Sequence, residues 1–408
     1  MKKKIASIFI CMLVAICSAF TAVTSTSVDK HILVIQSNSS KQGGTMLITE
    51  FNGNRVIEVD SGGTIIWEKA GLNDPVDAER LANGNTLIAE LGNNSVIEVD
   101  SSGNTVWNYS ALIGPFDVER LANGNTLIMD TYNDRVIEVD SGGTIVWEKD
   151  GLYLSTDAER LANGNTLIAE WGNNSVIEVD SGGNIVWSYN AAIGPVDAER
   201  LANGNTLITE YLYGNRVIEV DNSGNLVWEY NNSSAILFDA ERLANGNTLI
   251  TEFLYGNRVI EVDSSGTIFW EKTGLDLPID VERISKPPDA PTISGPNNGK
   301  PNIEYDFTFN SVDPDGDDVR FIIDWGDGDN ETTSFTTSGT NLTVSHSWSE
   351  KGTYSIIARA EDGYNALSDW TEPHLISIQK SKSIQNLFLT WLHNHPNLFP
   401  IIRQLLGL

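Results

Sequence analysis

Carboxylates recur at two positions of a repeated phrase, and they are the side chains whose number and spacing could do chemistry. The tetrad Asp-x-Glu-Arg occurs six times, at successive steps of 40, 40, 40, 42 and 41 residues. Its aspartates form a first acid set: Asp77, Asp117, Asp157, Asp197, Asp239 and Asp280. A second acid set ends the apolar run that follows or precedes each tetrad: Glu50, Glu90, Asp130, Glu170, Glu210 and Glu252. Crowded carboxylates bind hard cations such as Ca²⁺, pair with arginine, or stay partly protonated.

The predicted strands place both acid sets at the same end of the fold, which we call its mouth. The start of one strand and the end of the next lie at the same end of an antiparallel pair. Trp171, Tyr211 and Phe253 directly follow acids of the second set, and aromatic faces beside carboxylates suit sugar rings or a partner's loops. We therefore expect a ligand site there. Hydrogen bonding of loop N–H groups is the alternative for the acids, and packing between repeats is the alternative for the aromatic residues.

Each repeat reads as four short strands. In one unit they are residues 157–161, 166–170, 176–180 and 184–187, rich in β-branched residues and bounded by Gly, Asn and Ser. Asn-Gly in the first turn favours a tight hairpin. A tryptophan closes every unit, at steps of 40, 40, 40, 41 and 42 residues. A period near 40 with four strands per unit is typical of a β-propeller.

The two ends of the repeat region predict how the ring closes. The region begins with "GGTMLITEF", which lacks the Asp-x-Glu-Arg strand, and ends with "PIDVERIS", which consists of that strand alone. The last piece can therefore complete the first blade. This gives six full blades and removes exposed sheet edges. The expected fold class is all-β, a six-bladed propeller closed by its C-terminal strand, followed by a second β domain.

An arginine and a glutamate that recur in the repeats predict ion pairs within the propeller. The arginine of each tetrad recurs with a glutamate of the third strand, the first such pair being Arg80 and Glu58. A charge buried between blades needs a partner, and this period supplies one in each unit. We expect arginine–glutamate ion pairs that tie strands together.

Several known repeat families share these motifs. "MDTYNDRVIEVDSGGTIVW" resembles NHL repeats, and "DAERLANGNTLI" with "VIEVD" resembles the propeller of arylsulfotransferases. The Gly-then-Trp ending is also similar to quinoprotein repeats. The resemblance covers residues 44–285 and implies a propeller, whereas a shared fold alone implies little about function.

The catalytic residues that these resemblances would imply are missing. The five histidines are His31, His346, His374, His393 and His395, so none lies between residues 44 and 285. An arylsulfotransferase depends on a propeller histidine, and NHL-type lyases hold a metal through histidines. The sequence also offers no cysteine nucleophile and no Ser–His pair. We expect no enzyme here, and no catalytic residue is assigned.

A second domain follows a Pro- and Gly-rich linker at residues 286–301. "DWGDG" at residues 324–328 and "HSWSEKGTYSI" at residues 346–356 resemble a PKD domain, which implies an Ig-like β-sandwich used as a spacer or adhesion module. Within it, Asp313, Asp315 and Asp317 are spaced closely enough to hold calcium. A solvated turn is the alternative. Calcium is thus a candidate cofactor, and no other cofactor is indicated.

The chain ends and the charge predict the location. Lys2, Lys3 and Lys4 before an apolar stretch indicate an export signal over residues 1–27. The apolar tail, residues 380–408, is broken by Pro396 and Pro400 and resembles endings of archaeal exported proteins; it could associate with the cell envelope. A formal net charge of −29 argues against nucleic acid as a partner. The expected domains are residues 1–27, 28–285, 286–379 and 380–408.

These observations favour a secreted or cell-surface protein that binds without catalysis. Its propeller mouth would hold a ligand, a glycan or an extracellular partner protein, in an adhesion or surface-structural role. An arylsulfotransferase-like enzyme and a calcium-stabilised surface-layer component are the alternatives.

Overall fold

The computed structural model describes residues 44–190, 192–211, 214–363, 366–379, 384–395 and 404. The expected export signal lies outside these residues, as does most of the expected tail. The chain divides into two compact units at Ile284/Ser285.

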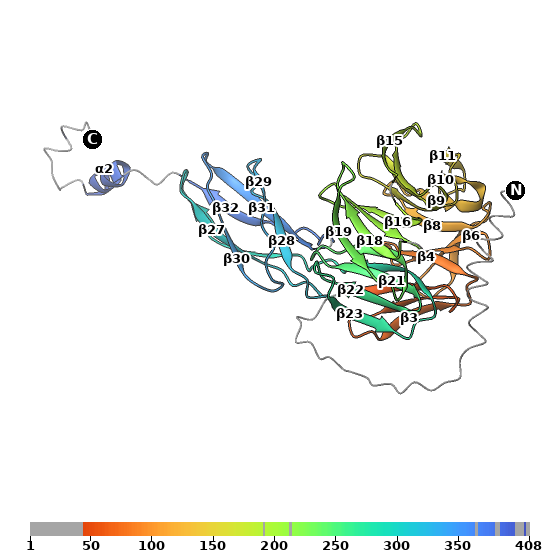
Figure 1. The fold of residues 1–408 in the computed structure, drawn as a ribbon. Helices are drawn as coiled ribbons and strands as arrows, with labels where there is room; N and C mark the ends of the chain where they lie inside the picture. The colour runs from red at the N-terminus through yellow and green to blue at the C-terminus, as the bar shows by residue number, and fades with distance from the viewer. Residues whose placement is uncertain are drawn as a thin grey trace. The chain divides into compact units, whose positions relative to one another are not determined.

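The first unit is a propeller of six four-stranded antiparallel sheets (Figure 1). The innermost strands are β24 (Pro278–Ile284), β4 (Pro75–Arg80), β8 (Pro115–Arg120), β12 (Ser155–Arg160), β16 (Pro195–Arg200) and β20 (Ile236–Arg242). The second strands, in the same blade order, are β1 (Thr45–Glu50), β5 (Thr86–Glu90), β9 (Thr126–Asp130), β13 (Thr166–Glu170), β17 (Thr206–Glu210) and β21 (Thr248–Leu254). The expected all-β propeller is confirmed.

The third and fourth strands complete each blade outward. The third strands are β2 (Arg55–Val59), β6 (Ser95–Val99), β10 (Arg135–Val139), β14 (Ser175–Val179), β18 (Arg216–Val220) and β22 (Arg258–Val262). The outermost are β3 (Ile65–Ala70), β7 (Thr105–Tyr109), β11 (Ile145–Asp150), β15 (Ile185–Tyr189), β19 (Leu226–Asn231) and β23 (Ile268–Thr273). In two blades a short 3-10 turn joins the second strand to the third. The turn η1 (Thr131–Asn133) joins β9 to β10, and η2 (Trp171–Asn173) joins β13 to β14.

Strand β24 closes the ring as the sequence predicts. It pairs antiparallel with β1, from Thr45 opposite Ile284 to Glu50 opposite Pro278. The first and last segments of the propeller therefore share one sheet, in the order β24-β1-β2-β3.

Burial explains why the repeats need one another. The second strands, such as β5, are buried along their whole length, whereas the outer strands, such as β3, alternate exposed and half-buried residues. A strand buried on both faces must lie between two other blades. One blade alone could not cover its apolar faces, which is the physical reason for the repetition.

The second unit is the expected Ig-like sandwich. One sheet has the order β25 (Thr292–Ser294), β27 (Tyr305–Asn310) and β30 (Leu342–His346). The other has the order β26 (Asn298–Gly299), β32 (His374–Ile378), β31 (Gly352–Asp362), β28 (Val319–Asp324) and β29 (Asn330–Thr332). Trp325 and Trp348 fill the core between the sheets, at 1% and 0% exposure.

A short helix, α2 (Ile384–Asn394), follows the sandwich. Among the described residues, no helix has both the length and the apolar character that a membrane span requires.

Candidate functional site: an acid-lined central channel

The innermost strands bring two rings of carboxylates to the propeller axis. Successive side chains of a strand point to opposite faces, so Asp77 and Glu79 of β4 share one face, and both line the channel together with Ala78 between them. The same holds in every blade, and the channel encloses about 430 Å³. We call its two acid sets the Asp ring and the Glu ring. The Asp ring is Asp77, Asp117, Asp157, Asp197, Asp239 and Asp280, and the Glu ring is Glu79, Glu119, Glu159, Glu199, Glu241 and Glu282.

Sequence reasoning missed the Glu ring, although a signal for it was present. The Asp-x-Glu spacing within a strand is the two-residue alternation that puts both side chains on one face. The glutamate of each tetrad must therefore lie on the same strand face as the aspartate.

A bulge in each innermost strand closes one end of the channel. In β12 the register shifts between Ser155 and Asp157, so Thr156 has no residue opposite it on β13. A bulge re-aims side chains, and Thr156 and Asp157 both line a small space of about 40 Å³ at this end. The equivalent residues form a collar: Val76, Phe116, Thr156, Val196, Phe238 and Ile279.

The collar is packed, so the channel is a cup. Its six residues are only 0–5% exposed. Phe116 and Phe238 come from opposite blades, and their rings stack with centroids 6.1 Å apart. The open end therefore lies beyond the Glu ring, beside the exposed turns that follow the innermost strands, such as residues 82–84. The sequence predicts the open end where the innermost strands begin. That end is closed by the collar, because the bulge turns bulky side chains onto the axis.

Each carboxylate of the two rings also ties one blade to the next. The Asp77 Oδ2 atom accepts the Val118 N–H at 2.9 Å, and the Glu79 Oε2 atom accepts the Arg120 N–H at 2.7 Å. The same pair of bonds recurs at all six blade junctions. Edge N–H groups of the innermost strands are thereby satisfied. Every bond uses Oδ2 or Oε2, so the other oxygen of each carboxylate can accept a bond from a ligand.

Burial first, and crowding second, raises the pKa of the acids in both rings. Burial raises the pKa of Asp197 and Asp280 to about 7, and raises that of Glu199 to about 8. Burial and neighbouring carboxylates hold the pKa of Asp77 and Asp157 well above the ordinary range. Part of the channel is therefore protonated at neutral pH, and a bound cation would favour the ionised form.

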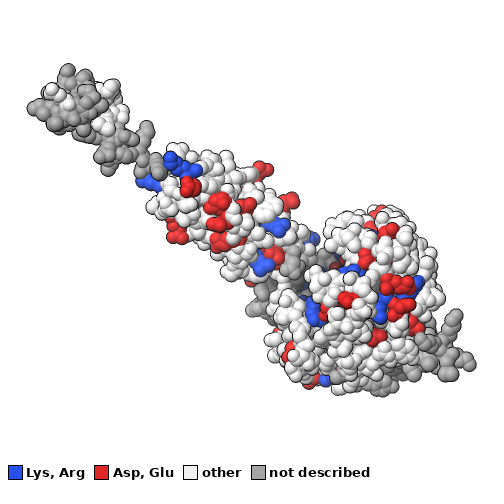
Figure 2. All heavy atoms as spheres, turned by 90° about the horizontal axis from the view of Figure 1, so that it is seen from above, with Lys and Arg blue, Asp and Glu red and all other residues white. Residues whose placement is uncertain are grey.

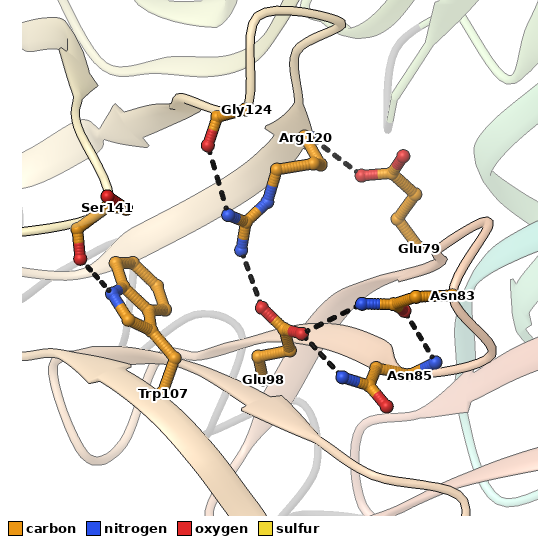
Figure 3. A network of polar contacts seen from close by, with 8 residues as sticks. All are labelled: Glu79, Asn83, Asn85, Glu98, Trp107, Arg120, Gly124 and Ser141. Carbon is orange, nitrogen blue, oxygen red and sulfur yellow. Dashed lines mark hydrogen bonds and ion pairs between the residues drawn. The ribbon is translucent and has the colours of Figure 1, made fainter.

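In five of the six tetrads the arginine pairs with a glutamate of the preceding blade, as Figure 3 shows for Arg120. Arg120 Nη2 lies 2.8 Å from Glu98 Oε2, and Asn85 Nδ2 donates to Glu98 Oε1 at 2.6 Å. The Arg120 guanidinium also lies over the Trp107 ring, whose Nε1–H donates to the Ser141 carbonyl of the next blade. The expected ion pairs are confirmed in five blade junctions, at 2.7–3.1 Å.

Removing one of these counter-charges should destabilise the propeller. We expect Glu98→Gln to lower the free energy of unfolding by about 2 kcal/mol, because Arg120 would remain half-buried without its anion. The matched control is Glu148→Gln, which removes the partner of Arg135 from an outer strand where the Glu148 side chain is 41% exposed. That change should cost less than about 0.5 kcal/mol. Denaturant unfolding followed by tryptophan fluorescence measures both, and equal losses would contradict a special role for the junction pair.

The second acid set lies outside the channel. Its members are 0–6% exposed. Glu90 accepts the Asn73 N–H at 3.0 Å, Asp130 accepts the Ile113 N–H at 2.7 Å, and Glu210 lies 2.6 Å from Arg216. Glu50, Glu170 and Glu252 likewise accept bonds from loop groups. The expectation that both sets share one mouth is therefore wrong in position, because the second set is used to hold loops between blades.

The aromatic residues expected beside the mouth are mostly core residues. Tyr211 and Phe253 are 2% and 0% exposed, and both pack against the collar residue Phe238 with ring centroids 5.5 and 5.4 Å away. Trp171 is half-buried and packs against the same core. The ring faces of Tyr211 and Phe253 are thus unavailable to a sugar, because packing between blades covers them.

The sandwich contains the expected acidic cluster. One carboxylate oxygen from each of Asp313, Asp315 and Asp317 lies within 4.8 Å of the others. Asp313 is 3% exposed, and its Oδ1 accepts the N–H groups of Asp315 and Asp317, while its buried Oδ2 has no hydrogen-bond partner among the described residues. A second group that the sequence reasoning missed joins Asp327, Asp329 and His346. On the face that Figure 2 shows, acidic and basic side chains are interspersed on a mostly uncharged surface.

The chain is therefore a propeller-repeat protein, with a closed six-bladed ring, an acid-lined channel and an Ig-like sandwich as its second domain. Residues 52–213 and 132–297 match the family described as outer membrane protein assembly factor BamB. Together these matches span more than half of the chain, which therefore belongs to this family of propeller-repeat proteins. Residues 292–374 match the PKD domain family, which confirms the second domain. No curated protein matches the chain significantly.

Solved structures are similar to one or the other part of the chain. A protein of unknown function from Bacteroides caccae is 16% identical with a TM-score of 0.53, covering 60% of this chain and 100% of its own. A PKD domain of an M14-like peptidase from a Thermoplasmatales archaeon is 37% identical, covering 24% of this chain and 100% of its own, with a TM-score of 0.23. Virginiamycin B lyase from Staphylococcus aureus is 16% identical with a TM-score of 0.45, covering 58% and 86%.

Proposed function

We propose that this chain is a non-catalytic binding protein whose ligand occupies the central channel of the propeller. The observation that carries the proposal is the cup itself, about 430 Å³ lined by two acid rings and floored by the collar. A concave site with converging polar groups is the usual form of a ligand site. Each ring carboxylate keeps one oxygen that the blade junctions do not use.

An enzyme of the arylsulfotransferase-like class is the less favoured alternative. Residues 44–285 contain no histidine and no cysteine. The channel lining consists of carboxylates, alanines and valines, with no nucleophile paired to a base. The finer resemblance to arylsulfotransferase or NHL propellers therefore supports the fold of the repeats rather than their chemistry.

We further propose that the protein acts outside the cell. The positively charged and apolar N-terminal segment supports export. A PKD domain beside a propeller supports an adhesive or surface-exposed module whose partner is a glycan or an extracellular protein. The apolar ending, residues 380–408, would supply contact with the cell envelope.

A thermal-shift screen tests the binding proposal on residues 28–408, the chain left after the expected cleavage. A ligand that binds only the folded state raises the melting temperature by mass action. At a ligand concentration one hundred times Kd, the free energy of unfolding rises by about 2.7 kcal/mol. The panel holds cations, oligosaccharides and an aryl sulfate donor. A shift that is lost in Glu79→Gln/Glu159→Gln/Glu241→Gln supports a channel ligand, whereas turnover of the aryl sulfate would establish the enzyme instead.

A calcium-stabilised surface component is the second candidate, and the buried Asp313 carboxylate favours it. Calcium at 5 to 10 times Kd should raise the unfolding transition of the sandwich by about 3 °C or more, since oxygen ligands of this spacing suit the ion. Asp317→Asn should abolish the shift, while Asp306→Asn, on an outward position of β27 in the same domain, should leave it unchanged. A calcium response that survives Asp317→Asn would remove this cluster from consideration.

A further inference from the structure

The channel wall alternates charge and apolar surface along its axis. Going outward from the collar, the Asp ring comes first, then a band of small apolar side chains, then the Glu ring. The band is Ala78, Val118, Ala158, Ala198, Ala240 and Val281. The two acids of one strand are two residues apart, which corresponds to about 6.7 Å along the strand. The wall thus presents negative charge at two depths with an apolar belt between them.

This arrangement does not preorganise a metal ion. Among the described residues, the groups of three ligand atoms within 4.8 Å of one another all lie in the sandwich and none in the channel. Calcium takes six to eight oxygens at 2.3–2.6 Å. The ring carboxylates are held on separate blades, each fastened by an N–H bond to its neighbour, so they cannot converge on one small ion without breaking those bonds.

The floor of the cup contains one polar group that the scaffold does not use. Five collar positions are apolar, but the sixth is Thr156, which is 3% exposed and faces the space beside the Asp ring. Its Oγ1 atom is buried and has no hydrogen-bond partner among the described residues. A buried hydroxyl without a partner destabilises the fold unless a ligand or water satisfies it. Val196 occupies the equivalent position in the next blade, so a hydroxyl is not needed for packing there.

We propose that the channel binds a linear aliphatic diamine or polyamine, with one ammonium group at the Asp ring and Thr156 and the next at the Glu ring. The inference rests on the proposed function of the channel and names its ligand class. In 1,4-diaminobutane five bonds of about 1.5 Å in a zigzag separate the nitrogens by about 6 Å, which matches the separation of the rings. The methylene chain then lies along the strand edges at the alanine and valine belt, whose residues are 2–3% exposed. Each ammonium has three donors. Because no three ring carboxylates bring ligand atoms within 4.8 Å of one another, each ammonium donates to two of them at most, and at the Asp ring Thr156 Oγ1 accepts the third bond.

The raised pKa of the ring acids agrees with this reading, since burial and mutual repulsion leave the channel short of positive charge. An extended dication relieves repulsion at both depths at once. A monoamine relieves it at one depth only.

Isothermal titration of residues 28–408 at pH 8 tests the proposal, because ring acids with a pKa of about 7, such as Asp197, Asp280 and Glu159, are then mostly ionised and alkyl ammonium groups remain charged. The probes are butylamine, diamines of three, four, five and eight carbons, spermidine and Ca²⁺. We expect 1,4-diaminobutane or 1,5-diaminopentane to bind at least tenfold more tightly than butylamine and than the eight-carbon diamine. Equal affinity for all chain lengths would overturn the proposal. So would tighter binding of Ca²⁺ than of every diamine by the Asp317→Asn chain, in which the acidic cluster of the sandwich is disrupted.

Two variants locate the amine. Thr156→Val copies Val196 of the next blade, so it should fold, and it should weaken the best diamine about five- to tenfold through the loss of one hydrogen bond to a charge. Glu79→Gln/Glu159→Gln/Glu241→Gln keeps an acceptor for each junction N–H and should weaken binding at least tenfold. The matched control, Glu68→Gln/Glu148→Gln/Glu229→Gln, removes three carboxylates from outer strands and should change affinity less than twofold.

The outcomes separate this inference from the proposed function. An oligosaccharide or metal ion that binds wild type but not the channel triple variant, with no diamine binding, would refute the diamine and keep the channel as a ligand site. Diamine binding unchanged by Thr156→Val would refute the assigned depth. No probe affected by the channel variants would refute both proposals.

Discussion

Acidification from pH 8 to pH 5 should raise the melting temperature of the propeller by about 10 °C. Burial raises the pKa of Asp280 from 3.8 to about 7 and that of Glu159 to about 7. Between the unfolded and folded values, the folded chain binds more protons than the unfolded chain, so stability rises as the pH falls. One such group contributes about 3 kcal/mol over this range, and 1 kcal/mol shifts a domain of this size by roughly 2–4 °C.

Differential scanning calorimetry of the whole chain measures the effect, with the sandwich transition as an internal comparison. The pH stops at 5 because other acids act in the opposite direction below it. The pKa of Asp100 and of Asp180 is lowered, chiefly by hydrogen bonds from asparagine side chains in the outer hairpins. The channel triple variant should show a smaller rise than wild type, since three of the titrating groups are gone. A propeller most stable at pH 8 would contradict an acid-crowded channel.

Loss of the closing strand should abolish the folded propeller. A shortened chain of residues 44–277 lacks β24, which leaves β1 as an open edge and the first blade with three strands. It also loses the Asp280 and Glu282 carboxylates, which accept the N–H groups of Ala78 and Arg80. An exposed edge of this kind invites aggregation. We expect aggregation on expression, and no cooperative thermal transition for any soluble fraction.

The matched control is a chain of residues 44–285, which retains β24 and ends at the boundary between the two units. It should unfold cooperatively, with a melting temperature within about 5 °C of the propeller transition in the whole chain. Cooperative unfolding of the shorter chain would show that the closing strand is dispensable.

Repetition made much of the scaffold readable from the sequence. Asp-x-Glu-Arg and the closing tryptophan gave the period, and the incomplete ends at residues 44 and 285 predicted a shared blade. The pairing of Arg120 with Glu98 followed from the same period, because a contact between equivalent positions must recur with the repeat. "DWGDG" and "HSWSEKGTYSI" indicated the sandwich in the same way, through local motifs.

The position of the site depended on contacts between blades, which no local pattern encodes. The sequence by itself determined that Asp77 and Glu79 share a strand face, since alternation is a property of one strand. Only the tertiary structure decided that the bulge beside Asp157 turns Thr156 onto the axis, and that Phe116 and Phe238 meet across it to form a floor. These residues come from different blades, and their packing appears only when the ring closes. For the same reason Tyr211 looked like a surface aromatic residue in the sequence but became a core residue in the fold.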